Sequence, residues 1–211
     1  MSNAPVNLPS GNSYSTKQGS NGGTINYTVI NSLGAQGSTT ATDLQGMNGN
    51  KALNYALGSN IDASATSAWN AGAGFAPIGT NVAQFSGSFD GLGHTISGLT
   101  INLPGTDNIG MIGYTNSSAR ISNVGMVNVD ITGRNVVGGL AGSNSGSISN
   151  SYTTGSVSGS TYVGGLAGSS NSGATINNSY ATGTWMPPAT VSAGWSGLIT
   201  GPSVTATTPV M

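Results

Sequence analysis

The segment NVVGGLAGSNSGSISNSYTTGSVSG, residues 135–159, decides how this chain folds. A near copy, YVGGLAGSSNSGATINNSYATGTW, follows at residues 162–185, and neither copy contains a charged residue. Repeated architecture explains such a pair better than two identical catalytic sites. Self-similarity with a period of about 20–50 residues is the sequence signature of solenoids and related repeat proteins. We therefore interpret the chain as a stack of repeated coils.

Two anchors give the period of the repeat. The first is the second glycine of each Gly-Gly pair, at Gly139 and Gly165, with a degenerate copy at Gly110. The second is an isoleucine in a short alternating strand, which recurs after 25, 27 and 28 residues at Ile96, Ile121, Ile148 and Ile176. Alternation with period two predicts β-strands, and the Ser/Asn/Gly stretches between them predict turns. The sequence therefore predicts an all-β chain, a parallel β-solenoid with coils of about 25–29 residues.

Stacked coils place equivalent residues above one another, so the repeat predicts columns of side chains. The expected inward stack consists of Ile96, Ile121, Ile148, Ile176, Leu140 and Leu166, with Val137 and Val163 beside them. The interior is thin, and small residues such as alanine and glycine are expected to set how closely the coils approach.

Polar and aromatic residues align in the same register. Asn123, Asn150 and Asn178 are either a structural ladder of side-chain amides between coils or residues that suit a turn. Tyr152 aligns with Tyr180, and this pair is either a surface contact for sugar rings or ordinary sheet packing.

The chain divides into three regions. Residues 1–50 hold the strand TINYTVI and are a candidate N-terminal cap, and residues 51–184 form the solenoid. Residues 185–211 leave the repeat pattern and are a C-terminal cap or a disordered tail. The first residues, MSNAPVNLPSG, show no signal peptide, and no stretch reaches the roughly 18 apolar residues of a membrane span.

Composition excludes several classes of partner. Only 4% of the residues are charged, with four Lys and Arg against five Asp, for a net charge of −1. In an ordinary globular protein about 25% of the residues are charged. Four scattered cations do not form the clusters that bind nucleic acid or an anionic membrane. We therefore expect no nucleic-acid partner, no membrane insertion and no cofactor.

The sequence offers little for catalysis. His94 and Asp90, in FDGLGHTI, are the one acid/base candidate, and we interpret this stretch instead as a turn between two strands. Polysaccharide lyases and hydrolases on β-solenoids need paired carboxylates, or calcium-binding acids with a base. The five Asp are too scattered for this, so we predict a non-enzyme with no catalytic, cofactor or metal residues.

The repeat also carries a family resemblance. VGGLAGSNSGSISNSYTTGSVSG resembles the GLUG repeat of large bacterial surface proteins. The preceding YTVINSLGAQGSTTATDLQGMNGN resembles segments of filamentous-haemagglutinin-like exoproteins, and the resemblance covers roughly residues 20–184. It implies a right-handed parallel β-helix, two-partner or related secretion, and a secreted or cell-surface location. Because such proteins are usually far longer, we expect a fragment, an abridged paralogue or an engineered piece.

The leading hypothesis is a non-enzymatic extracellular segment of a bacterial adhesin. Its partners are expected to be a host-cell or matrix surface, glycans included, bound through many weak contacts at fixed spacing. The alternative is a structural protein that self-associates end to end, because open coil ends present unpaired backbone groups. A polysaccharide-active enzyme is less favoured, and no regular Thr-x-Thr face supports an ice-binding solenoid.

Overall fold

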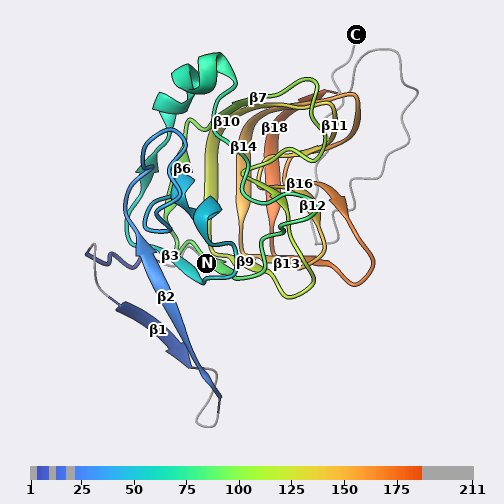
Figure 1. The fold of residues 1–211 in the computed structure, drawn as a ribbon. Helices are drawn as coiled ribbons and strands as arrows, with labels where there is room; N and C mark the ends of the chain where they lie inside the picture. Colours follow the sequence, from blue (N-terminus) through green and yellow to red (C-terminus); the bar gives the residue numbers. More distant parts are fainter. Residues whose placement is uncertain (1–3, 10–12, 18–21, 187–211) are drawn as a thin grey trace.

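The computed structural model describes residues 4–9, 13–17 and 22–186 of the chain. Parallel strands wind into a β-solenoid of about six turns, with about 28 residues in each coil (Figure 1). The predicted fold class is therefore confirmed. The helical content of the described residues is limited to two short 3₁₀ helices, η1 (Gln45–Gly49) and η2 (Ser64–Gly72). None of the described helices is long and apolar enough to cross a membrane.

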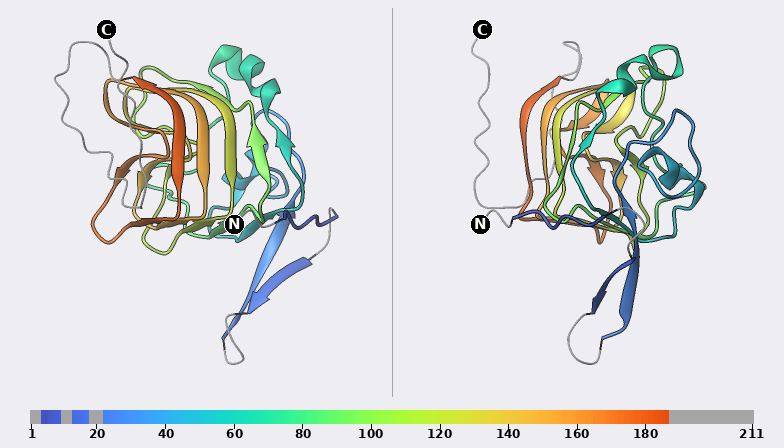
Figure 2. Two further views of the ribbon diagram at one scale, coloured as in Figure 1. Left: turned by 180° about the vertical axis from the view of Figure 1, so that it is seen from behind. Right: turned by 90° about the vertical axis from the view of Figure 1, so that its left-hand side faces the viewer.

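Strands from successive coils pair to form long sheets along the solenoid. Sheet A contains, in spatial order, β1 (Ser13–Lys17), β2 (Thr24–Ile30), β3 (Tyr55–Leu57), β5 (Ser88–Asp90), β9 (Arg120–Ser122), β13 (Ser147–Ser149) and β17 (Thr175–Asn177). All neighbours in it are parallel except β1 and β2, which form an antiparallel hairpin. This hairpin projects from the body of the solenoid in every view (Figure 2).

Three further sheets complete the coils. Sheet B contains β18 (Tyr180–Met186), β14 (Tyr152–Ser158), β10 (Gly125–Thr132), β6 (Thr95–Ser97) and β4 (Ile61–Asp62), and β7 (Thr100–Asn102) also pairs with β10. Sheet C contains β16 (Ala167–Ser170), β12 (Ala141–Asn144) and β8 (Ile112–Tyr114), and sheet D contains β11 (Asn135–Gly138) and β15 (Thr161–Gly164). A complete coil therefore visits sheets A, B, D and C in that order.

The inward columns follow the predicted register in the repeats. Ile121, Ile148 and Ile176 are register partners in sheet A. Ile121 and Ile148 are buried, whereas Ile176, on the last described strand of the sheet, is half-buried. Leu140 and Leu166 are also buried. These side chains form the interior because alternate residues of a strand point to opposite faces.

Ile96 occupies a different column from the one predicted. The residue that precedes Ile121 in the sheet A column is Phe89. Ile96 is buried, but it lies in sheet B, in register with Ile61 and Met126. The prediction of one column containing all four isoleucines is therefore wrong. Residues 91–94 connect β5 to β6, whereas only residues 123–124 connect β9 to β10. The interval of 25 residues from Ile96 to Ile121 therefore runs from a column of sheet B to a column of sheet A.

Glycine is required in the Gly-Gly motif because neighbouring coils approach closely there. A Cβ atom at Gly139 would collide with the carbonyl oxygen of Gly165 and with the side chain of Thr153. Small residues continue in the C-terminal coils, whereas the bulky side chains of Tyr55, Phe75 and Phe85 fill the earlier ones. The solenoid interior is thus packed with aromatic residues toward its N-terminal end.

The predicted division into a cap, a solenoid and a tail stays a prediction. The N-terminal region contributes β1, β2 and η1, and β2 already belongs to sheet A. Of the predicted C-terminal cap or tail, residues 187–211 lie outside the described residues.

Candidate functional surface

A stacked pair of tyrosines lies on the outer face of sheet B. Tyr152 and Tyr180 begin β14 and β18 and are register partners. Their ring centroids are 5.3 Å apart and their planes differ by 7°. The ring of Tyr152 lies over Gly125, where a Cβ atom would come within 2.5 Å of the ring. The stack therefore starts over a glycine and ends at Tyr180, which is 53% exposed.

Two rows of polar side chains continue this face beyond the tyrosines. In register order they are Thr100, Asp130, Ser156 and Thr184 in one row, and Asn102, Thr132 and Ser158 in the other. We call these residues the hydroxyl rows. Thr132 and Ser158 are joined by a hydroxyl–hydroxyl hydrogen bond of 2.9 Å, and Ser156 and Thr184 by one of 3.0 Å. Asp130 is the one charged residue in the rows.

A groove of about 330 Å³ lies where the hydroxyl rows meet η2. It is lined by Ser67, Gly72, Thr100, Ile101, Asn102, Asp130 and Thr132. Hydroxyl, amide and carboxylate groups in this lining can donate to or accept from the hydroxyl groups of a ligand. The groove therefore offers hydrogen-bonding groups to a polar molecule.

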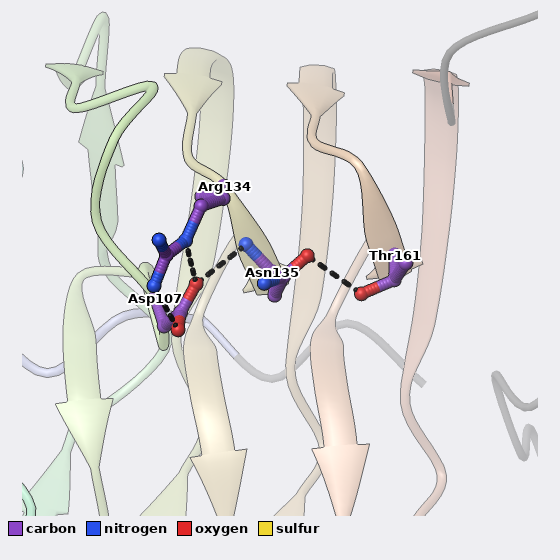
Figure 3. Close-up of polar contacts among 4 residues, drawn as sticks. All are labelled: Asp107, Arg134, Asn135 and Thr161. Carbon is purple, nitrogen blue, oxygen red and sulfur yellow. Dashed lines mark hydrogen bonds and ion pairs between the residues drawn. The ribbon is translucent and has the colours of Figure 1, made fainter.

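The ion pair of the described residues joins coils rather than forming a reactive site (Figure 3). Arg134 donates from Nε and Nη2 to the two carboxylate oxygens of Asp107, at 2.7 and 2.6 Å. The backbone N–H of Asn135 donates to the same carboxylate, and the hydroxyl of Thr161 donates to Asn135 Oδ1 at 2.8 Å. The hydrogen bonds and charge of Arg134 hold the pKa of Asp107 below its ordinary value. The network thus connects three successive coils.

The three aligned asparagines occupy turns. Asn123, Asn150 and Asn178 have φ angles of 54°, 49° and 49°, in the left-handed region that asparagine tolerates better than most residues. The side-chain amide of Asn123 donates to Asp90 Oδ1 at 2.9 Å. Among the described residues, no hydrogen bond joins the amides of the three asparagines to one another. The geometry therefore favours the turn interpretation over the amide ladder.

His94 and Asp90 do not form an acid/base pair. Asp90 Oδ1 accepts hydrogen bonds from the backbone N–H of Leu92 and from Asn123. The His94 ring is buried and contacts Asn60 and Val6 instead. No group of three or more His, Cys, Asp or Glu side chains within the described ranges is placed to hold a metal ion.

The sequence contained signals for features that we did not predict. Asp107 and Arg134 are 27 residues apart, which is one coil, so opposite charges separated by one period pointed to an inter-coil ion pair. The hydroxyl rows were harder to recognise, because serine and threonine are common throughout this chain.

Comparisons with known proteins agree with the repeated coils of the solenoid. The GLUG motif matches residues 159–186, a stretch that includes β15 to β18. This chain carries a GLUG repeat. Halomucin from Haloquadratum walsbyi is 44% identical over 108 residues, which make up 49% of this chain and 1% of halomucin. The chain therefore spans a very small part of that relative. No solved structure matches the chain.

The matches support the GLUG repeat but not the more specific resemblance to two-partner exoproteins. Neither match confirms the predicted resemblance to filamentous-haemagglutinin-like exoproteins. The relation to two-partner exoproteins therefore stays a prediction.

Proposed function

We propose that this chain is a non-enzymatic segment of a secreted or cell-surface GLUG-repeat protein, which mediates adhesion through many weak contacts with neutral glycans. The GLUG match and the similarity to halomucin support a surface protein. The observation that carries the glycan assignment is the stack of Tyr152 and Tyr180 on a nearly uncharged outer face of sheet B.

The chemistry of this face matches that of a neutral sugar. The C–H face of a pyranose packs against an aromatic ring, and the exposed ring of Tyr180 offers such a surface. The sugar hydroxyls exchange hydrogen bonds with serine, threonine and asparagine, which the hydroxyl rows supply. Each contact is weak, and repetition along a rigid solenoid raises the overall avidity.

The placement of the carboxylates supports a function without catalysis. Glycoside hydrolysis generally uses two carboxyl groups about 5–10 Å apart that flank the scissile bond. Asp107 is committed to Arg134. Asp43 is buried and accepts hydrogen bonds of 2.7 Å from Ser38, Thr40 and the backbone of Gly46. These two carboxylates therefore stabilise the fold.

A glycan array identifies the preferred neutral oligosaccharide, and titration calorimetry then compares the wild type with Tyr180→Ala. We expect the variant to bind about fivefold more weakly, because aromatic contacts of this size contribute about 1 kcal/mol. Tyr162→Ala is the matched control, since Tyr162 is 58% exposed but lies in β15 of sheet D. Unchanged binding by Tyr180→Ala would contradict the assignment. A release of reducing sugar by the wild type would contradict the non-enzymatic function.

A further inference from the structure

Asp130 differs from the other carboxylates of this chain. Asp43, Asp62, Asp90 and Asp107 each accept at least one hydrogen bond that stabilises a turn or joins two coils. The side chain of Asp130 is exposed on β10, and across the described part of the chain it makes no hydrogen bond and no ion pair. A carboxylate that has no structural partner is free to accept hydrogen bonds from a ligand.

The groove beside this carboxylate has one wall that the fold holds in place. η2 forms the wall and lies next to β7 (Figure 1). The backbone N–H of Thr100 donates to the buried hydroxyl of Thr66 in η2 at 2.9 Å. Just after η2, Phe75 N–H donates to Thr100 O at 2.9 Å. In the same stretch, Asn102 N–H donates to Ala73 O at 2.8 Å. The groove is therefore preformed, and a preformed site loses less entropy when it binds a ligand.

The groove and the tyrosine stack lie on the same outer face of sheet B. Asp130 is the register partner of Ser156, which follows Tyr152 by four residues in β14. A strand rises about 3.3 Å per residue and neighbouring strands lie about 4.8 Å apart, so about 15 Å separates the two sites. A single sugar ring is too short to contact both sites, whereas several linked sugars can do so.

The Asp130 carboxylate can discriminate between sugars by their charge. Its oxygens accept hydrogen bonds from sugar hydroxyls, and hydrogen bonds to an ionised group are stronger than those between neutral groups. A sugar acid in the groove would instead bring a second negative charge beside Asp130. Of the described residues that line the groove, none is a lysine or arginine that could balance this charge. Arg134, in the turn after β10, is paired with Asp107. The groove therefore favours hydroxyl groups over carboxylates.

We propose that the groove is a second subsite of the glycan-binding face and that Asp130 is its specificity-determining residue. This subsite presupposes the proposed binding of neutral glycans and adds two properties to it. The ligand is a linear oligosaccharide of several units, which extends from the tyrosine stack to the groove. Its unit in the groove is a neutral sugar whose hydroxyls donate to Asp130, and acidic sugars are excluded by charge repulsion.

Asp130→Asn tests the subsite, because asparagine keeps the shape of the side chain and removes the charge. Titration calorimetry compares two probes, the neutral oligosaccharide selected on the glycan array and the same oligosaccharide after oxidation of its primary hydroxyls to carboxylates. We expect the wild type to bind the oxidised probe at least about tenfold more weakly than the neutral one. Asp130→Asn should bind the neutral probe about fivefold more weakly than the wild type does, and the difference between the two probes should shrink to about twofold.

Two further measurements sharpen the test. Salt should narrow the difference between the probes in the wild type, because it screens exposed charges. The monosaccharide unit of the neutral probe should bind to the wild type at least about tenfold more weakly than the intact oligosaccharide, since it cannot contact both sites. Equal affinity for the two lengths would overturn the extended ligand.

Asp62→Asn is the matched control, because Asp62 is an exposed carboxylate in β4 of the same sheet and does not line the groove. Asparagine retains the Oδ1 atom that accepts from Ser64 N–H, and this variant should keep the wild-type preference. An unchanged preference in Asp130→Asn, with neutral binding still dependent on Tyr180, would overturn the subsite but not the proposed function. A wild type that binds no neutral glycan would overturn both.

Discussion

At the scale of single residues, one column of the solenoid repeatedly uses left-handed backbone. Asn108, Val136 and Tyr162 occupy equivalent positions in three coils, with φ angles of 60°, 57° and 53°. A β-branched residue in this region is a genuine outlier, and the left-handed conformation costs an L-residue about 1–2 kcal/mol. The carbonyl oxygen of Val136 accepts a hydrogen bond of 3.1 Å from the backbone N–H of Ile109 in the preceding coil, and its neighbours Asn135 and Val137 pair with the next coil. The repeat thus imposes its backbone on residues that do not favour it.

Val136→Asn should raise the free energy of unfolding by about 1 kcal/mol, because asparagine tolerates this conformation and already occupies position 108. Thermal or urea unfolding measures the change. Val163→Asn is the control, since Val163 packs against the core in sheet D and is not at a left-handed position. It should lower stability. A loss of stability in Val136→Asn as large as that in the control would contradict the strain argument.

Thr153 places a hydroxyl in the interior without a hydrogen-bond partner. The residue is 2% exposed, and its Oγ1 atom has no partner among the described residues. Thr153→Val keeps the shape of the side chain and removes the unpaired hydroxyl, so it should stabilise the protein by about 1 kcal/mol. Thr182→Val, at an exposed position in the neighbouring strand, should change the melting temperature little. A destabilised Thr153→Val variant would show that the hydroxyl has a partner.

The buried side chain of Tyr55 should make the fold less stable at alkaline pH. Burial raises the pKa of Tyr55 to about 12, from an ordinary value of 10.0. The unfolded chain therefore loses this proton first, and the stabilisation, which is complete below pH 10, falls as the pH rises toward 12. Tyr55→Phe should be less stable near neutral pH, because it lacks the hydrogen bond to the carbonyl of Asn50, and it should show a shallower alkaline decline. Urea unfolding from about pH 9 to pH 12 measures the free energy of unfolding of both proteins. An equal fall in the wild type and in Tyr55→Phe would show that Tyr55 does not cause the alkaline decline.

At the scale of the element, each strand separates an inward from an outward residue within a single step. In β13, Ile148 is fully buried between Ile121 and Ile176, whereas Ser149 is half-exposed. Ile148→Asp would bury a carboxylate without a partner and should cost several kcal/mol. Ser149→Asp should cost little, because its side chain reaches water. Similar unfolding midpoints for the two variants would contradict the assignment of inward and outward faces.

The strands of the regular repeats were predictable because each repeat carries its own sequence signals. Between residues 120 and 185, alternation and recurring glycines specify strand, turn and register together, as the partners Ile121, Ile148 and Ile176 show. The earlier coils lack this redundancy. The longer turn at residues 91–94 shifted Ile96 to another column, and η2, a 3₁₀ helix that we did not predict, follows β4 of sheet B. Side-chain partners such as Asn60 and His94, which are 34 residues apart, depend on those irregular turns.

At the scale of the whole molecule, the solenoid displays side chains at regular intervals on a rigid frame. Sheets A and B extend from the first coils to the last described ones, so the outer face of sheet B places the tyrosine stack and the hydroxyl rows on one surface. The predicted end-to-end self-association also belongs to this scale and stays a prediction. The arrangement of this surface depends on the alignment of neighbouring coils.

A pair of engineered cysteines tests that alignment most directly, because the natural chain has no cysteine. Ser156 and Thr184 are register partners whose hydroxyl groups are 3.0 Å apart, close enough for a disulfide. Under mild oxidation, the variant with Ser156→Cys and Thr184→Cys should form an intramolecular disulfide rapidly and almost completely. The variant with Ser158→Cys and Thr184→Cys, two residues out of register, should not. Equal rates of disulfide formation in the two variants, measured by mass spectrometry, would contradict the stacked-coil account.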